Sequence, residues 1–283
     1  MTVAQALRDA ARGLEAASDT ARLDAEVLMA HALGVSRSDM LLRHMAADPP
    51  SGFAPLVARR MVREPVAYIV GRQEFYGRDF RVSPAVLIPR SDSETIVEAA
   101  LEACARPARV LDCGVGSGAL LLTVLAEKEG AQGVGIDRSS DALAIAGTNA
   151  AALGLGERAV LLGRDWTRPG WSDGLGRFDV ILANPPYVEE AAELAPSVRQ
   201  FEPAGALFAG ADGLDDYRIL VPQLPDLLSP NGIAVLEIGS TQATAVSLIA
   251  ETAGFSAELR RDLAGRERVL ILRLGLGKSL RND

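Results

Sequence analysis

The sequence predicts an α/β fold in which a doubly wound, mostly parallel sheet follows a small helical domain. Three observations support this prediction. Beyond Ile96, apolar runs of strand length alternate with helical stretches, the pattern of strands joined by crossover helices. Residues 1 to about 70 show helical periodicity and no strand signal. The first apolar run ends in a glycine-rich turn. We therefore expect a helical bundle over residues 1–72, a β-hairpin linker over 73–90 and the α/β domain over 91–283.

The N-terminal segment is expected to form several short helices. Its first apolar residues, Val3, Leu7 and Leu14, recur at helical spacing. Asp19 and Thr20 are typical helix-capping residues. The helices expected after them cover Ala21–Leu33, closed by Gly34, and Phe53–Glu64, with Ser36 or Ser38 capping one in between. Such a bundle usually binds a partner or supports a neighbouring domain.

The linker and the sheet follow in chain order. Glu74–Tyr76 and Asp79–Val82 flank Gly77, as expected for a β-hairpin with a short turn. The strands expected in the α/β domain are Arg109–Asp112, Gly133–Asp137, Ala159–Leu162, Phe178–Ala183, Ile233–Ile238 and Val269–Leu274. The helices expected between them are Ala119–Lys128, Asp141–Leu153, Tyr217–Leu228 and Ala243–Ala253.

Composition excludes several classes of function. The longest apolar run, Ala119–Ala126, is too short to span a bilayer, and the N-terminus lacks a secretory signal. We therefore expect a cytoplasmic protein with no membrane partner. Cys104 and Cys113 form no metal-ligand pair, and His31 and His44 lie far from them in sequence. A zinc site or a Ser-His-Asp hydrolase is not expected, and no metal is assigned.

The charge argues against a nucleic-acid partner. The formal net charge is −8, whereas duplex-binding enzymes neutralise phosphates with a basic surface. The one basic cluster, Arg59, Arg60 and Arg63, has helical spacing and indicates a solvated helix face.

A glycine-rich turn marks a candidate cofactor site. The first strand ends in Asp112 and continues as Cys113-Gly114-Val115-Gly116-Ser117-Gly118 into a helix. Glycines at alternate positions allow a tight turn and let a ligand lie against bare amides. The next strand ends at Asp137, nineteen residues beyond Gly118, where a carboxylate can accept hydrogen bonds from ribose hydroxyls. The alternative is that the glycines form a tight turn and bind no ligand, but the preceding strand and the spacing of Asp137 favour a nucleotide-like ligand.

The spacing of these glycines resembles the first motif of S-adenosylmethionine methyltransferases and does not fit the nicotinamide fingerprint G-x-G-x-x-G. Trp166, after the third strand, either flanks an adenine ring or is a plain packing residue, and both interpretations stay open. The residues that we expect to bind the cofactor are Gly114, Val115, Gly116, Ser117, Gly118, Asp137, Trp166 and Asn184.

The fourth strand delivers a second motif, Asn184-Pro185-Pro186-Tyr187. Taken alone it is a turn that stops a strand. An amide or arylamine nitrogen is a poor nucleophile, because its lone pair is delocalised. Two acceptors, the Asn184 side-chain oxygen and the Pro185 carbonyl, can orient it, while two prolines stiffen the turn and Tyr187 packs over the planar group. We expect Asn184, Pro185 and Tyr187 to be catalytic, and the same residues with Pro186 to bind substrate.

At this point the chain resembles the release factor glutamine N5-methyltransferases, the HemK/PrmC family, along nearly its whole length. The motifs that carry the resemblance are Glu64–Ile69, Glu74–Tyr76, Leu87–Arg90, Gly114–Gly118, Asp137, Trp166, Asn184–Tyr187, Phe201–Pro203, Leu207–Gly210 with Asp212–Leu214, and Leu236–Gly239. Departures from the family pattern are mild and occur at Ser91, Ser93, Cys113 and Val115.

The resemblance implies a Rossmann-like class I methyltransferase sheet and methyl transfer from S-adenosylmethionine, leaving S-adenosylhomocysteine. The implied substrate is the glutamine of the Gly-Gly-Gln loop in peptide chain release factors, and the helical domain is implied to bind the release factor. The sequence does not reveal the oligomeric state, and a monomer is the simplest expectation. The resemblance also implies an antiparallel hairpin at the sheet edge, with Arg268–Leu274 as its second arm.

Three alternatives remain. A sister enzyme that methylates a glutamine of a ribosomal protein shares the fold and chemistry, although Ser91–Glu94 favours the release-factor branch. An adenine N6-methyltransferase shares Asn-Pro-Pro-Tyr, but the acidic charge opposes it. A non-catalytic binding protein would have little reason to keep both Asp137 and Asn184.

Overall fold

The computed structural model describes residues 1–275, which fall into two compact units. One unit contains Met1–Arg72 together with Leu194–Glu202, and the other contains Gln73–Glu193 and the chain from Pro203 onward. Within the described residues, no helix has the length and apolar character needed to cross a membrane.

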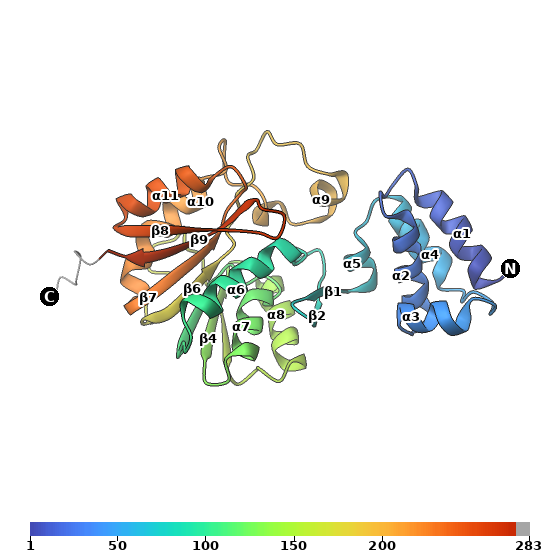
Figure 1. The fold of residues 1–283 in the computed structure, drawn as a ribbon, viewed down its shortest axis with the longest axis horizontal. Coiled ribbons are helices and arrows are strands. Elements are labelled where there is room, and N and C mark those ends of the chain that lie inside the picture. Colours follow the sequence, from blue (N-terminus) through green and yellow to red (C-terminus); the bar gives the residue numbers. More distant parts are fainter. Residues whose placement is uncertain (276–283) are drawn as a thin grey trace. The chain divides into compact units, whose positions relative to one another are not determined.

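The first unit is helical, as the sequence predicts (Figure 1). Its helices are α1 (Val3–Leu14), α2 (Ala21–Leu33), α3 (Arg37–Asp39), α4 (Phe53–Met61), α5 (Val66–Val70) and α9 (Pro196–Phe201), with a π-helical turn at Met40–His44. Leu7, Leu28 and Met29 are fully buried in its core. Thr20 does occupy the N-cap of α2, but its side chain makes no capping hydrogen bond; its hydroxyl donates to Asp24 Oδ1 instead (2.9 Å).

The expected hairpin is formed by β1 (Arg72–Phe75) and β2 (Arg78–Arg81), and all of it except Arg72 belongs to the second unit. Both turn residues have positive φ, 52° at Tyr76 and 72° at Gly77, as a two-residue turn that follows the strand twist requires. Phe75 and Phe80 pack edge to face at 6.1 Å between ring centroids.

The rest of the second unit is a seven-stranded sheet in the order β5-β4-β3-β6-β7-β9-β8. The strands are β3 (Arg109–Cys113), β4 (Gln132–Asp137), β5 (Ala159–Gly163), β6 (Phe178–Ala183), β7 (Leu228–Glu237), β8 (Phe255–Arg261) and β9 (Glu267–Leu274). Strands β3 to β7 pair in parallel, while β9 runs antiparallel to β7 and β8. The expected edge hairpin is therefore present.

Helices cover both faces of this sheet (Figure 1). On one face lie α6 (Glu94–Ala103), α7 (Ala119–Glu127) and α8 (Ser140–Ala152); on the other lie α10 (Asp215–Leu220) and α11 (Ala243–Thr252). Alternate residues of the central strands enter opposite cores, because successive side chains of a strand point to opposite faces. Val110 and Val180 belong to the first core, and Leu111 and Ile181 to the second.

The sequence-based boundaries are wrong in a few places. The helix expected at Tyr217–Leu228 ends at Leu220 and continues as a 3-10 helix over Val221–Leu227, and Leu228 already belongs to β7. Pro222 and Pro225 explain this, because proline lacks the N–H that an α-helix needs. Helix α4 ends at Met61 rather than Glu64. Helix α6 is absent from the predicted elements, and β8, the first arm of the expected hairpin, has no predicted bounds.

A buried asparagine fastens the hairpin to the sheet unit. Asn149, on α8, is 1% exposed. Its Oδ1 accepts from the Arg81 N–H (2.7 Å), and its Nδ2 donates to the carbonyls of Arg81 (3.0 Å) and Ser117 (2.8 Å). One side chain thus fixes β2 and the end of the glycine-rich loop at once.

We expect Asn149→Ala to lower the free energy of unfolding by about 2 kcal/mol, because it leaves backbone donors and acceptors unpaired. Urea denaturation measures the change. Thr148→Ala is the matched control, since the neighbouring Thr148 is exposed and its hydroxyl donates to the Ala144 carbonyl within its own helix. Equal stability of the two variants would contradict this role of Asn149.

Candidate active site

Parallel pairing brings the ends of four strands into one row. The paired residues of this row are Ile136 in β4, Cys113 in β3, Ala183 in β6 and Leu236 in β7. The next residues along the chain are, in the same order, Asp137, Gly114, Asn184 and Glu237. Residues that the sequence separates by more than a hundred positions therefore meet at the carboxyl edge of the sheet, where ligands bind in this type of fold.

The glycine-rich loop has a backbone that only glycine adopts easily. Gly114, Gly116 and Gly118 have φ values of 84°, 52° and 85°. The loop turns back on β4, since the N–H groups of Gly114 and Val115 both donate to the Ile136 carbonyl (2.9 and 2.8 Å). Space is also limited, because a Cβ at Gly114 would lie 3.3 Å from the Trp166 ring. The bare Gly114 thus lets Trp166 approach the loop closely.

Asp137 is oriented by the backbone around it. Its Oδ2 accepts from the Gly116 N–H (3.0 Å), and its Oδ1 accepts from the Ser139 N–H (2.9 Å). The side chain is half-buried. Because each carboxylate oxygen has two lone pairs, Asp137 can still accept hydrogen bonds from a ligand while it holds the loop.

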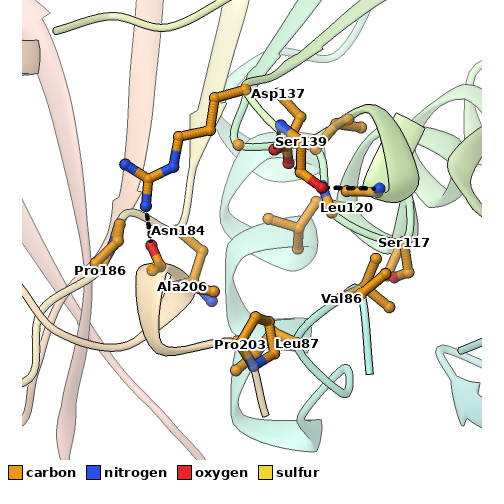
Figure 2. Close-up of a pocket in the computed structure, with 18 of the residues that line it drawn as sticks. Val86, Leu87, Ser117, Leu120, Asp137, Ser139, Asn184, Pro186, Pro203 and Ala206 are labelled. Carbon is orange, nitrogen blue, oxygen red and sulfur yellow. Dashed lines mark hydrogen bonds between the residues drawn. The ribbon is translucent and has the colours of Figure 1, made fainter. Parts of the chain in front are cut away.

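A cavity of about 210 Å³ lies over this edge (Figure 2). Its lining combines polar groups with apolar ones such as Val86, Leu120 and Ala142. Trp166 also lines it and is anchored by its Nε1–H, which donates to Asp216 Oδ1 (2.9 Å). Burial raises the pKa of the Asp216 carboxyl above its usual range, although the bond from Trp166 opposes the rise.

A second wall comes from a distant part of the chain. The turn Pro203–Ala206 lines the cavity through Pro203, Gly205 and Ala206. Arg138 reaches this turn and donates from Nη2 to the Gly205 carbonyl (2.7 Å), drawn as a dashed line in Figure 2. The sequence analysis missed Arg138 and Gly205. The only signals were the position of Arg138 directly after Asp137 and the Phe201–Pro203 motif upstream of the turn.

The Asn-Pro-Pro-Tyr turn follows β6 at the same edge. Asn184 and Pro186 line the cavity, as Figure 2 shows. Within residues 1–275 the Asn184 side chain makes no hydrogen bond, so its amide is available to a ligand. Tyr187 instead lines an adjoining shallow cavity with Arg90 and Asp92, and its hydroxyl donates to Glu237 Oε1 (3.2 Å). Burial raises the pKa of Tyr187 far above its usual value, and the neighbouring Glu237 charge adds to the rise.

The structure thus brings together most residues that the sequence predicts for the site. Those that line the main cavity are Gly114, Val115, Gly116, Ser117, Asp137, Trp166, Asn184 and Pro186. Gly118, Pro185 and Tyr187 are not among the lining residues. Gly118 instead precedes α7, and a Cβ there would lie 2.8 Å from Leu122. Within the described residues there is no cluster of three or more His, Cys, Asp or Glu side chains that could hold a metal.

Two known protein domains match separate parts of the chain. Residues 5–71 match the PrmC N-terminal domain, and residues 92–207 match the methyltransferase small domain. A solved methyltransferase from Pyrococcus furiosus has the same fold, with a TM-score of 0.53 at 17% identity over 79% of this chain and 100% of that one. The fold and the matched domain define a methyltransferase of the doubly wound class.

Curated relatives narrow the class to a family. A release factor glutamine methyltransferase of Cereibacter sphaeroides is 43% identical over 97% of this chain and 99% of its own length. Another, of Rhodospirillum rubrum, is 42% identical over 89% of this chain and 78% of its own. The chain belongs to the release factor glutamine methyltransferase family.

One buried carboxyl below the loop titrates unusually. Asp112, 1% exposed, accepts from the Leu121 N–H through Oδ2 (3.3 Å), while its Oδ1 has no hydrogen-bond partner among the described residues. Burial raises the pKa of Asp112 to about 7, the Leu121 bond opposes the rise, and the Asp137 charge adds to it. The ionised form is therefore disfavoured in the folded protein.

Asp112 should make the wild-type protein less stable as pH rises. An unfolded aspartate has a pKa of about 3.9, so between that value and about 7 the folded state binds more protons and stability falls with pH. We expect Asp112→Asn to raise the free energy of unfolding by about 2 kcal/mol at pH 8, with a smaller gain at pH 5. Urea denaturation at both values checks this, and a gain independent of pH would refute it.

Proposed function

We propose that this protein transfers a methyl group from S-adenosylmethionine to the side-chain amide nitrogen of a glutamine in a peptide chain release factor. We propose that this glutamine belongs to a Gly-Gly-Gln loop, as the family resemblance implies. The observation that carries the proposal is the position of Asn184. Its side-chain amide, which has no hydrogen-bond partner in the described part of the chain, faces the cavity that the glycine-rich loop and Asp137 also line.

The cavity fits S-adenosylmethionine in its chemistry. Asp137 offers carboxylate oxygens at the end of β4, which suits the two hydroxyls of a ribose. Trp166 and the apolar residues beside it offer surface for an adenine ring. Gly114 and Gly116 expose backbone next to the start of α7, where a carboxylate is favoured by the helix dipole. Bound there, the cofactor supplies a methyl group activated by a sulfonium centre.

The protein's own contribution is to orient the amide. Glutamine nitrogen is weakly nucleophilic because its lone pair is shared with the carbonyl group. The Asn184 side-chain oxygen and the Pro185 carbonyl accept its two N–H groups and favour the electron distribution needed for attack, while the Tyr187 ring packs against the amide plane. Catalysis is then positioning and electrostatic matching, and the proton released from nitrogen passes to water.

The helical unit is assigned to recognition of the protein substrate. It is a compact body with its own core, and its match to the PrmC N-terminal domain ends at residue 71. We propose that residues 1–72 bind the release factor while residues 91–283 bind the cofactor and the glutamine, with 73–90 linking them.

The substrate is tested by transfer of labelled methyl groups to purified release factor, ribosomal protein and RNA, with mass mapping of the product. A single methyl on the release-factor glutamine supports the proposal. Label on ribosomal protein or RNA alone would overturn it and point to a glutamine methyltransferase of ribosomal protein or to an adenine N6-methyltransferase.

We expect Asn184→Ala to lower kcat by at least about a hundredfold, because one of the two acceptors that orient the amide is lost. The affinity for S-adenosylmethionine should stay nearly unchanged. Single-turnover kinetics and calorimetric titration separate the two effects, and a variant with normal turnover would rule out the alignment by Asn184.

Asp137→Ala is expected to weaken cofactor binding, which Asn184→Ala should leave nearly unchanged. We expect a loss of S-adenosylmethionine affinity of about tenfold or more, because the ribose hydroxyls lose a charged acceptor. Asp141→Ala, an exposed carboxylate in the first turn of α8, serves as control in the same titration. Equal affinity in both variants would reject the assignment of Asp137.

A further inference from the structure

We propose that Glu237 is a positioning residue for the methyl transfer, which it serves by holding the phenol of Tyr187. This inference rests on the function proposed above, in which the Tyr187 ring packs against the substrate amide. Glu237 occupies the same row of strand ends as Asn184, one strand further along the sheet. Its Oε1 accepts the hydrogen bond from the Tyr187 hydroxyl at 3.2 Å.

The backbone of Tyr187 is already fixed without Glu237. Gln242 Nε2 donates to the Tyr187 carbonyl (3.0 Å), and this side chain is itself buried. Gly213 packs so closely that a Cβ there would lie 2.3 Å from the same carbonyl. With the main chain held, the direction of the ring depends on its two side-chain torsions. The ring packs against the second core, and the hydroxyl bond to Glu237 is the polar contact that holds its far end.

Glu237 is itself rigidly placed. It is the last residue of β7 and is 2% exposed. Its backbone carbonyl accepts from the hydroxyl of the buried Tyr217 (2.7 Å). Its other oxygen, Oε2, makes no hydrogen bond with any of the described residues. Burying a carboxylate with so few partners is costly, so a nearby charge has to compensate.

Arg268 supplies that charge from the neighbouring strand. It lies on β9 beside Val269, the pairing partner of Glu237, and is 7% exposed. Its guanidinium is clamped by Asp92 and Asp262, both at 3.3 Å. Burial raises the pKa of Glu237, whereas the nearby Ser93 hydroxyl and the Arg268 charge lower it. The pKa of Glu237 stays above its usual value, and the clamped Arg268 cation opposes part of the rise that burial causes. The hydrogen bond at 3.2 Å places Glu237 Oε1 as the acceptor for the Tyr187 phenol, and this acceptor is stronger when the carboxylate is ionised.

A double-mutant cycle tests the inference, with kcat, KM for release factor and cofactor affinity measured for Tyr187→Phe, Glu237→Gln and the double variant. We expect each single variant to lower kcat about tenfold, as for the loss of a charged hydrogen bond, with cofactor affinity unchanged. The double variant should be no slower than the slower single one, because both changes remove one interaction. Single effects that multiply in the double variant would overturn the inference.

Asp179→Asn is the matched control for a lost carboxylate. Asp179 lies at the opposite edge of the sheet and binds the N–H groups of Ala108 and Arg109 (2.8 and 3.0 Å). Its loss should reduce stability and leave kcat intact. If Glu237→Gln reduced only stability, as this control does, Glu237 would be structural and the inference would fail.

A spectroscopic readout separates this inference from the proposed function. The chain has four tyrosines, so the ¹³Cζ signal of Tyr187 can be assigned by comparison with Tyr187→Phe. We expect that signal to shift in Glu237→Gln, or in Glu237→Asp if the glutamine variant does not fold. Failure of wild-type protein to methylate release factor would sink the proposed function alone. An unmoved Tyr187 signal would sink the role of Glu237 even if methylation succeeds.

Discussion

The parallel register of β4, β3, β6 and β7 is the constraint on which the site depends. Because the paired row ends at Ile136, Cys113, Ala183 and Leu236, one further residue on each strand reaches the same edge. A slip of one residue would turn every side chain of a strand to the opposite face. The loop, the ribose acceptor and the amide acceptor would then no longer share a cavity.

The two apolar cores protect this register. Val110 and Leu111 are neighbours in sequence but lie in different cores. A slip of one residue would exchange the side chains of these two close-packed cores and leave cavities and clashes in both. Two buried acids, Asp112 and Glu237, lie near the carboxyl edge of the sheet, and their surroundings differ. Glu237 lies near the clamped Arg268, whereas Asp112 receives one backbone N–H. Burial raises the pKa of both acids, but a cation and a hydroxyl oppose the rise at Glu237, whereas a single backbone N–H opposes it at Asp112.

Sequence reasoning predicted what depends on local pattern. The central strands read as continuous apolar runs because both their faces are buried, and the glycine loop, Asp137 and Asn184 follow them directly. It failed where tertiary context decides. Pro222 and Pro225 sit within an apolar helical pattern, yet they convert it to a 3-10 helix. The hydrogen bond from Arg138 to Gly205 joins residues 67 positions apart in the sequence, and the bond from Tyr187 to Glu237 joins residues 50 positions apart. No local sequence pattern predicts either bond.

The segment Leu194–Glu202 groups with the helical unit although it is flanked on both sides by chain of the sheet unit. The polypeptide therefore crosses from one unit to the other three times, not once. The two parts cannot be exchanged between relatives as simple cassettes joined near residue 72, since a chimera cut only there would inherit a mismatched inner segment. Recombination within such a family is expected to succeed when Met1–Arg72 and Leu194–Glu202 come from the same parent. The evolution of the helical unit is therefore coupled to a short segment more than a hundred residues downstream.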